Sequence, residues 1–241
     1  MRKLLRVLLL VCGVALLIVA ATLLWGYRAT QRVPDFYVAA LEKPAAEPKQ
    51  AADEFEREVL ELQNGTRRAG EWQATFTTEE INGWLAHDLP IKFPDALPAE
   101  VSAPRVAIDR QMIQVACKYA GPQLTSVISL GVEPQVTSDP NVIAVRIRRV
   151  RAGSLPIPLG KFLDQISQHS AAAGLPLRWS EQEGDPLAII TLPLERSDLK
   201  GKVLRLKSIE LREGEVVISG ETEEDVPTEN GAGEPSSDAT R

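Results

Sequence analysis

Residues 142–153 read VIAVRIRRVRAG, and this stretch indicates the architecture of the chain. Apolar residues occupy every second position from Ile143 to Ile147, while Arg146 and Arg148 have the opposite phase. A period of two is typical of a β-strand with one buried face. We therefore expect the apolar face to pack on a core and the two arginines to lie on a solvated face of a sheet. A contact between these arginines and anionic lipid headgroups is the alternative.

Other segments of the chain have the same alternation. QLTSVISLGVEPQV at 123–136 precedes the quoted stretch, and turn residues fill 138–141 between the two strands. Connections this short join antiparallel neighbours. The sequence therefore predicts an antiparallel sheet with further strands at 106–108, 113–119, 187–194, 202–211 and 215–220, and with turns at 109–111 and 213–214.

Amphipathic helices are predicted on both sides of these strands. The first covers 49–64, and the second lies in FTTEEINGWLAHDLP (76–90), where Thr77 and Glu80 have the spacing of a capping box. In GSLPIPLGKFLDQI (153–166), two prolines stiffen the exit from a strand before a helical apolar stripe. The predicted fold class is α+β, with an N-terminal transmembrane helix and then an antiparallel β-sheet packed against two or three amphipathic helices.

The N-terminus begins MRKLLR and continues with an uncharged apolar run over residues 7–26. A helix of about 20 such residues crosses a hydrocarbon core of about 30 Å. Trp25 and Tyr27 fall at the far end of the run, where aromatic rings favour the membrane interface. We therefore expect a transmembrane anchor at 7–27 that binds the lipid bilayer, preceded by a cytoplasmic tail at 1–6.

The charges beside the anchor predict its orientation. Arg2, Lys3 and Arg6 precede it and favour a cytoplasmic N-terminus, whereas Arg28 and Arg32 follow it and weigh against that orientation. The expected location is the cytoplasmic (inner) membrane, with a single pass and an exported C-terminal domain.

Two other interpretations of the N-terminus stay open. A signal peptide could be cleaved after Ala21, because the small residues of VAA at 19–21 fit a loose cleavage rule. The apolar run continues to Trp25, however, which suits a retained anchor. A lipoprotein modified at Cys12 is disfavoured by Val11, since a small residue is wanted before the cysteine.

Composition divides the rest of the chain into three parts. Three prolines interrupt residues 28–48, which we expect to form a spacer, with a partner-binding segment as the alternative. Residues 49–221 hold the predicted helices and strands and form the exported α+β domain. Residues 222–241 form an acidic tail that is predicted to be disordered, because it has too few large apolar residues to fold.

Charge and reactive residues argue against several functions. The net charge is −6, and seven acidic residues from Glu221 onward against one basic residue, Arg241, account for all of it, so nucleic acid is not an expected partner. The two cysteines and the absence of a Cys/His cluster give a disulfide framework or a metal site no support. His87 and His169 fall at predicted helix ends, and no catalytic motif accompanies them. We expect no enzymatic activity and no cofactor.

Two roles suit a membrane-anchored, non-catalytic envelope domain. The first is a structural or interaction role with an envelope protein partner. The alternative is the binding of a lipid or another apolar envelope ligand in a cleft between sheet and helices. The candidate apolar ligand or packing face consists of Trp84, Leu155, Leu159, Phe162, Leu163, Ile166 and Trp179.

Three short segments carry a resemblance to a known group of proteins. RVPDFY (32–37), INGWL (81–85) and LPLRW (175–179) resemble segments of uncharacterised single-span envelope proteins from planctomycete-type bacteria, over most of 33–195. More distantly, the chain resembles the YpmS-like family, which pairs a helix carrying a Leu-Asn motif with a later LP-x-P helix. Neither resemblance implies catalytic residues. Some anchored envelope domains that combine a sheet with helices bind lipid tails, and this analogy holds at the level of the fold alone.

Overall fold

The computed structural model describes residues 28–42, 48–122, 125–157, 160, 163, 167, 177–192 and 202–224. The helices in this part of the chain are α2 (Asp35–Glu42), α3 (Pro48–Thr66), α4 (Thr78–His87) and α5 (Leu89–Lys92). The strands are β1 (Gly70–Thr77), β2 (Val101–Ile108), β3 (Ile113–Ala120), β4 (Thr125–Val136), β5 (Val142–Ala152), β6 (Leu155–Pro156), β7 (Leu177–Gln182), β8 (Asp185–Thr191), β9 (Lys202–Arg212) and β10 (Glu215–Glu224).

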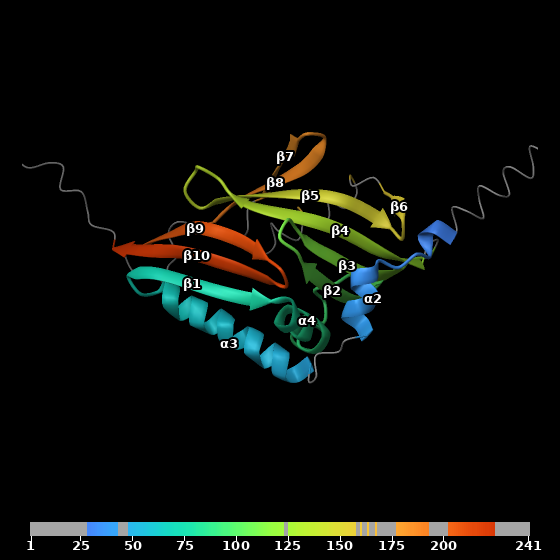
Figure 1. Ribbon diagram of the computed structural model, residues 1–241, viewed down its shortest axis with the longest axis horizontal. Helices are drawn as coiled ribbons and strands as arrows, with labels where there is room; N and C mark the ends of the chain where they lie inside the picture. Colours follow the sequence, from blue (N-terminus) through green and yellow to red (C-terminus); the bar gives the residue numbers. More distant parts are fainter. Residues whose placement is uncertain are drawn as a thin grey trace, which may run out of the picture.

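The predicted anchor at 7–27 and the tail at 1–6 lie outside the described residues. Within the residues that are described, no helix is long and apolar enough to cross a bilayer. These residues form an α+β body with antiparallel sheets, and the described chain begins at one end of the long axis and ends at the other (Figure 1).

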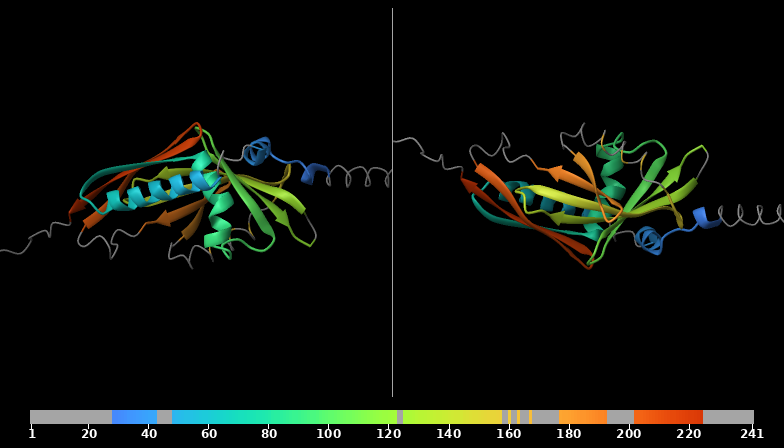
Figure 2. Two further views of the ribbon diagram at one scale, coloured as in Figure 1. Left: turned by 90° about the horizontal axis from the view of Figure 1, so that it is seen from below. Right: turned by 90° about the horizontal axis from the view of Figure 1, so that it is seen from above.

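A three-stranded antiparallel sheet in the order β1-β10-β9 forms one half of the body. Phe76 of β1 and Val216 of β10 are paired neighbours and belong to the same apolar core. Helix α3 covers this face (Figures 1 and 2), and the ring centroids of Phe55 and Phe76 lie 5.4 Å apart. The helix predicted at 49–64 is therefore confirmed, and Leu60 on it is exposed.

A seven-stranded sheet in the order β2-β3-β4-β5-β8-β7, with β6 beside β5, forms the other half. All of its pairings are antiparallel, as predicted. The hairpin turns between β2 and β3 and between β4 and β5 also fall where the sequence predicts them. The alternation of apolar and polar residues was therefore a sound guide to strand position and pairing.

Asn141 joins the two sheets. It lies in the turn between β4 and β5, is 1% exposed and has a φ of 56°. Its side-chain amide donates to the carbonyl oxygen of Leu204, and its Oδ1 accepts from the N–H of Leu206 at 2.8 Å. Because one short side chain supplies both a donor and an acceptor, it continues the backbone pairing of β9 across to the second sheet.

The expectation of a spacer at 28–48 is wrong for the described residues 28–42. Tyr37 of α2 is 0% exposed, packs against Ala116 and Val127, and donates a hydrogen bond from its hydroxyl to the carbonyl oxygen of Ala103 at 2.7 Å. Helix α2 is thus a layer on the seven-stranded sheet. Pro34 directly precedes α2, and Pro48 is the first residue of α3. Proline is tolerated where a helix begins, so these prolines are compatible with helices as well as with a spacer.

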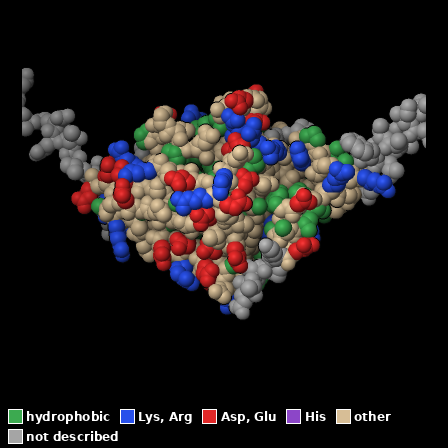
Figure 3. All heavy atoms as spheres, in the orientation of Figure 1, with side chains coloured by type: hydrophobic (Ala, Val, Ile, Leu, Met, Phe, Trp, Pro, Cys, Tyr) green, Lys and Arg blue, Asp and Glu red, His purple; other side chains and the backbone are tan. Residues whose placement is uncertain are grey.

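The boundary predicted at 221/222 falls inside β10, which continues to Glu224. Thr222 is 1% exposed and donates to the carbonyl oxygen of Thr66 at 2.9 Å. The acidic residues here are compatible with a strand because β9 places cations beside them: Lys207 lies 2.8 Å from Glu221. Figure 3 shows acidic and basic side chains side by side on this face of the molecule. The rest of the predicted tail, 225–241, lies outside the described residues.

Candidate functional site

A cavity of about 800 Å³ lies between α2, α4 and the edge strand β2. Pockets of about 300 to 1,000 Å³ are typical of sites for small ligands. The lining is predominantly apolar and includes Phe36, Ala39, Leu41, Ala86, Val106 and Ala107. The architecture therefore provides a space between helices and a sheet that could accept an apolar ligand.

Asn82 fixes the distance between α4 and β2. Its Nδ2 donates to the carbonyl oxygen of Val106 at 2.9 Å, and its Oδ1 accepts from the N–H of the same residue at 2.8 Å. Because β2 is an edge strand, these backbone groups face away from the sheet and need partners. Asparagine is a poor helix former, so its presence within α4 is explained by this contact.

The start of α4 and its contact with α3 are also specified locally. Thr77 accepts from the N–H of Glu80 at 3.2 Å, and the Glu80 carboxylate accepts from the N–H of Thr77 at 2.8 Å, which confirms the predicted capping box. At Gly83 an added Cβ would lie 2.5 Å from the Cβ of Ala51. Helices α3 and α4 can approach this closely because position 83 has no side chain.

Tyr37 holds α2 in place on the other side of the cavity. Burial raises the pKa of its hydroxyl above the ordinary value, and the charge of Arg105 opposes this effect. The hydroxyl therefore stays protonated as the donor to Ala103. Both walls of the cavity are thus tied to β2, one by a tyrosine and one by an asparagine.

The cavity contains few polar side chains. Arg105, Glu42 and Glu79 line it, together with Thr78, whose buried Oγ1 has no hydrogen-bond partner among the described residues. No group of three His, Cys, Asp or Glu side chains in the described residues could hold a metal ion. The arrangement suits the enclosure of an apolar chain with a polar end.

The described members of the predicted face, which are Trp84, Leu155, Leu163 and Trp179, are not part of the lining of this cavity. Trp84 packs instead between Phe55 and Phe93, with ring centroids 5.6 Å and 6.0 Å away. Leu155 lies in β6, paired with Ala152 of β5. Trp84 therefore lies in α4 and Leu155 in β6, and their assignment to one face was based on their apolar character alone.

Two other members of the face are linked. Trp179 of β7 donates from Nε1 to Oγ of Ser167 at 2.7 Å, and this hydroxyl donates to the carbonyl oxygen of Leu163 at 2.8 Å. Gly160, Leu163 and Ser167 are helical, as the crossover after 153 predicts. Three remaining members of the face lie outside the described residues: Leu159, Phe162 and Ile166.

His87, which the sequence places at a helix end, is the last residue of α4, and Asp88 follows it as the C-cap. His87 Nδ1 is 2.7 Å from the carboxylate of Asp88, and Lys92 Nζ is 2.9 Å from it. Burial alone would raise the pKa of Asp88, but the hydrogen bonds from His87 and Lys92 outweigh it and hold the pKa below its ordinary value. Lys92 also contacts Glu56 of α3. The group joins α3, α4 and α5.

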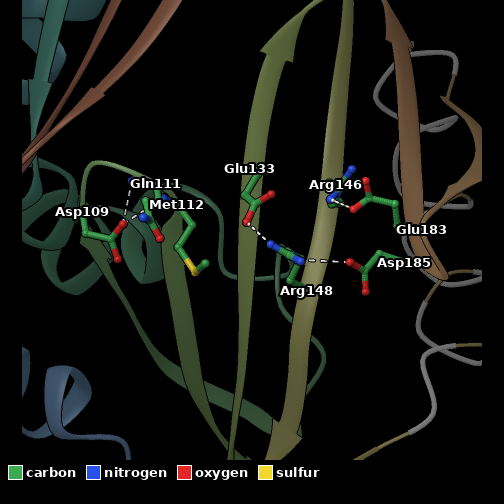
Figure 4. A network of polar contacts seen from close by, with 8 residues as sticks. All are labelled: Asp109, Gln111, Met112, Glu133, Arg146, Arg148, Glu183 and Asp185. Carbon is green, nitrogen blue, oxygen red and sulfur yellow. Dashed lines mark hydrogen bonds and ion pairs between the residues drawn. The ribbon is translucent and has the colours of Figure 1, made fainter.

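Of the two arginines predicted to lie on a solvated face of β5, Arg146 is buried, whereas the side chain of Arg148 is 36% exposed. Arg146 is 8% exposed and lies 3.0 Å from Glu183, and Arg148 lies 2.9 Å from Glu133 and 3.1 Å from Asp185 (Figure 4). Glu183 lies in the turn between β7 and β8, and Asp185 is the first residue of β8. Local sequence pattern could not indicate that these carboxylates reach β5.

The cavity residues were missed because they are individually ordinary. The small residues on α2 and α4 create a cavity because Tyr37 and Asn82 fix the distances of these helices from β2. Asn82 was the one available signal, as a polar residue between apolar ones in INGWL. Comparisons with models of protein families, with curated proteins and with solved structures find no match to this chain.

Proposed function

We propose that this protein is a non-catalytic envelope domain, anchored in the cytoplasmic membrane by 7–27, that binds a lipid acyl chain or a similar apolar ligand. The observation that carries the proposal is the predominantly apolar cavity of about 800 Å³ between α2, α4 and β2. The site differs from the predicted face, but its setting between sheet and helices is the one expected from the sequence.

Two features of the cavity support this function. The walls are preorganised by Tyr37 and Asn82, so that little ordering of the protein is needed when a ligand enters. The charged side chains of Arg105, Glu42 and Glu79 offer partners for a polar ligand end. Within the described residues this combination of apolar volume and few polar groups is typical of a pocket that binds a largely apolar ligand.

Photolabelling tests the proposal. Cells that express the full chain are supplied with a palmitate analogue carrying a diazirine, irradiated, and the labelled peptides are identified by mass spectrometry. We expect label in α2 and α4. In Ala39→Trp, a large ring fills the cavity, and we expect labelling there to fall about tenfold because the space for the chain is lost.

The matched control is Ala69→Trp, which adds the same ring at an exposed turn outside the cavity. This variant should label like the unmodified protein. Label confined to 7–27, or equal labelling of α2 and α4 in both tryptophan variants, would contradict acyl-chain binding in this cavity.

A structural or interaction role is the second candidate. Ile91 and Phe93 at α5 are 67% and 52% exposed, which is unusual for large apolar side chains. A groove of about 350 Å³ that includes Leu85 and Leu97 lies beside Phe93. If the cavity takes no ligand, this surface becomes the stronger basis for a function.

A further inference from the structure

The four arginines of β5 have two different environments. Arg146 and Arg148 have carboxylate partners from β4, the β7–β8 turn and the start of β8. Arg149 and Arg151 are exposed, and among the described residues no carboxylate lies within ion-pair distance of either. Arg149 has only a longer-range interaction with Asp109. Arg149 and Arg151 therefore stand near the end of β5 without an ion-pair partner among the described residues.

A β-bulge places these charges. Ser129 of β4 lies opposite Arg151, and Gly131 lies opposite Arg148, so that β5 has one more residue than β4 over this interval. Arg149 within the bulge has a φ of 55°, a conformation that costs free energy for a residue with a long side chain. Such strain is concentrated where the position of a side chain serves a function.

The start of the described chain brings a third arginine to the same place. Ser126 donates to the carbonyl oxygen of Thr30 at 2.6 Å, and Ser154 donates through its N–H to the carbonyl oxygen of Ala29 at 2.9 Å. A Cβ at Gly153 would lie 2.4 Å from that Ala29 oxygen. The segment can dock this closely because position 153 is glycine, and docking holds Arg32 beside β5.

The three arginines line one pocket of about 500 Å³ between the start of α2 and strands β3, β4 and β5. Asp35 is the acidic residue in the same lining, so the pocket carries three positive charges against one negative charge. We propose that Arg32, Arg149 and Arg151 form a binding site for a phosphate group.

The chemistry of the residues identifies the ligand class. A guanidinium presents paired N–H donors that match two oxygens of a phosphate, and hydrogen bonds between charged groups are stronger than neutral ones. A carboxylate offers two oxygens and one negative charge, whereas a phosphate offers more oxygens and up to two charges, which suits three arginines better. The phosphate could belong to a soluble molecule or to the headgroup of a lipid, and this site is independent of the apolar cavity.

Calorimetric titration of the full chain in a non-ionic, phosphate-free detergent distinguishes these sources. The probes are inorganic phosphate, dihexanoyl phosphatidylglycerol and, as a lipid without phosphate, dihexanoylglycerol. We expect binding of a phosphate-bearing probe and about tenfold weaker binding in R149Q/R151Q, because two charged donors are lost. Binding of inorganic phosphate assigns a soluble source, and binding of phosphatidylglycerol alone assigns a lipid source.

Two further variants separate recognition from folding. Asp35→Asn removes the acid from the pocket and should tighten binding several-fold, a gain that damage to the fold would not produce. Arg178→Gln removes an exposed arginine outside the pocket and should leave binding unchanged. No binding of either phosphate-bearing probe, equal binding by R149Q/R151Q, or equal binding of dihexanoylglycerol would overturn the proposal.

Discussion

Two asparagines perform the same task in different parts of the molecule. Asn82 and Asn141 each use one side-chain amide both to donate to a backbone carbonyl and to accept from a backbone N–H. Asn82 is half-buried and ties a helix to the edge of β2, while Asn141 is almost fully buried and ties one sheet to the other. The same pair of hydrogen bonds therefore fixes one wall of the cavity at Asn82 and the relative position of the two sheets at Asn141.

The largest effect is expected at Asn141. Asn141→Ala leaves the carbonyl of Leu204 and the N–H of Leu206 without partners and forces alanine into a left-handed conformation. We expect a loss of about 4 kcal/mol in the free energy of unfolding, measured by urea denaturation. Asn141→Gly should recover about 1 kcal/mol of this, because glycine adopts that φ freely. Equal losses in the two variants would show that backbone strain plays no part.

Asn82→Ala should cost less, about 1.5 kcal/mol in the same measurement. Val106 loses both partners, but position 82 is only half-buried whereas Asn141 is 1% exposed, and alanine is the better helix former. Asn82→Asp is the sharper variant, because it keeps the acceptor for the N–H of Val106 and turns the donor into a second oxygen that faces the carbonyl. It should be at least as destabilising as alanine at pH 7. A neutral effect would mean that the donor half of the contact is unimportant.

The sequence predicts the helices and strands of this fold better than the tertiary contacts between them. The capping box of Thr77, the hairpin turns and most strands follow from local period and turn residues. Strand β1 is not among the strands predicted from the sequence. Its pairing with β10 joins residues that are far apart in the sequence, and no local pattern contains that information.

The candidate site was harder to predict for the same reason. Apolar residues such as Trp84 attract attention as ligand contacts, but large apolar side chains are mostly used to fill a core. The cavity is lined by small residues such as Ala39 and Ala86, which carry no signal until the distances between helices and sheet are known. Ion pairing of the arginines also depends on which strands lie side by side. Arg146 and Arg148 have carboxylate partners on neighbouring elements, whereas Arg151 has none among the described residues.

The smallest loss in the free energy of unfolding is expected at Asp109. Its side chain only accepts hydrogen bonds, so it contrasts with the two asparagines, which also donate. Its oxygens accept from the N–H groups of Gln111 and Met112 at 2.8 and 2.9 Å and from the Gln114 amide at 3.1 Å (Figure 4 shows the first two). Burial alone would raise the pKa of Asp109, but these bonds and the charge of Arg149 outweigh it and hold the pKa below 3.8. Here the side chain is an acceptor only, so Asp109→Asn should cost about 1 kcal/mol at pH 7.

The cost of Asp109→Asn should depend on pH. Because the folded pKa is depressed, the stabilisation from the carboxylate is complete above the ordinary value of 3.8 and is lost as pH falls through the folded pKa. The difference in unfolding free energy between the unmodified protein and the variant should therefore be constant from pH 7 to about 5 and shrink below about pH 4. Taking the difference removes the contribution of other acids, such as Asp88, whose pKa is also lowered. A cost that stays constant below pH 4 would show that Asp109 acts through the geometry of its turn and not through its charge.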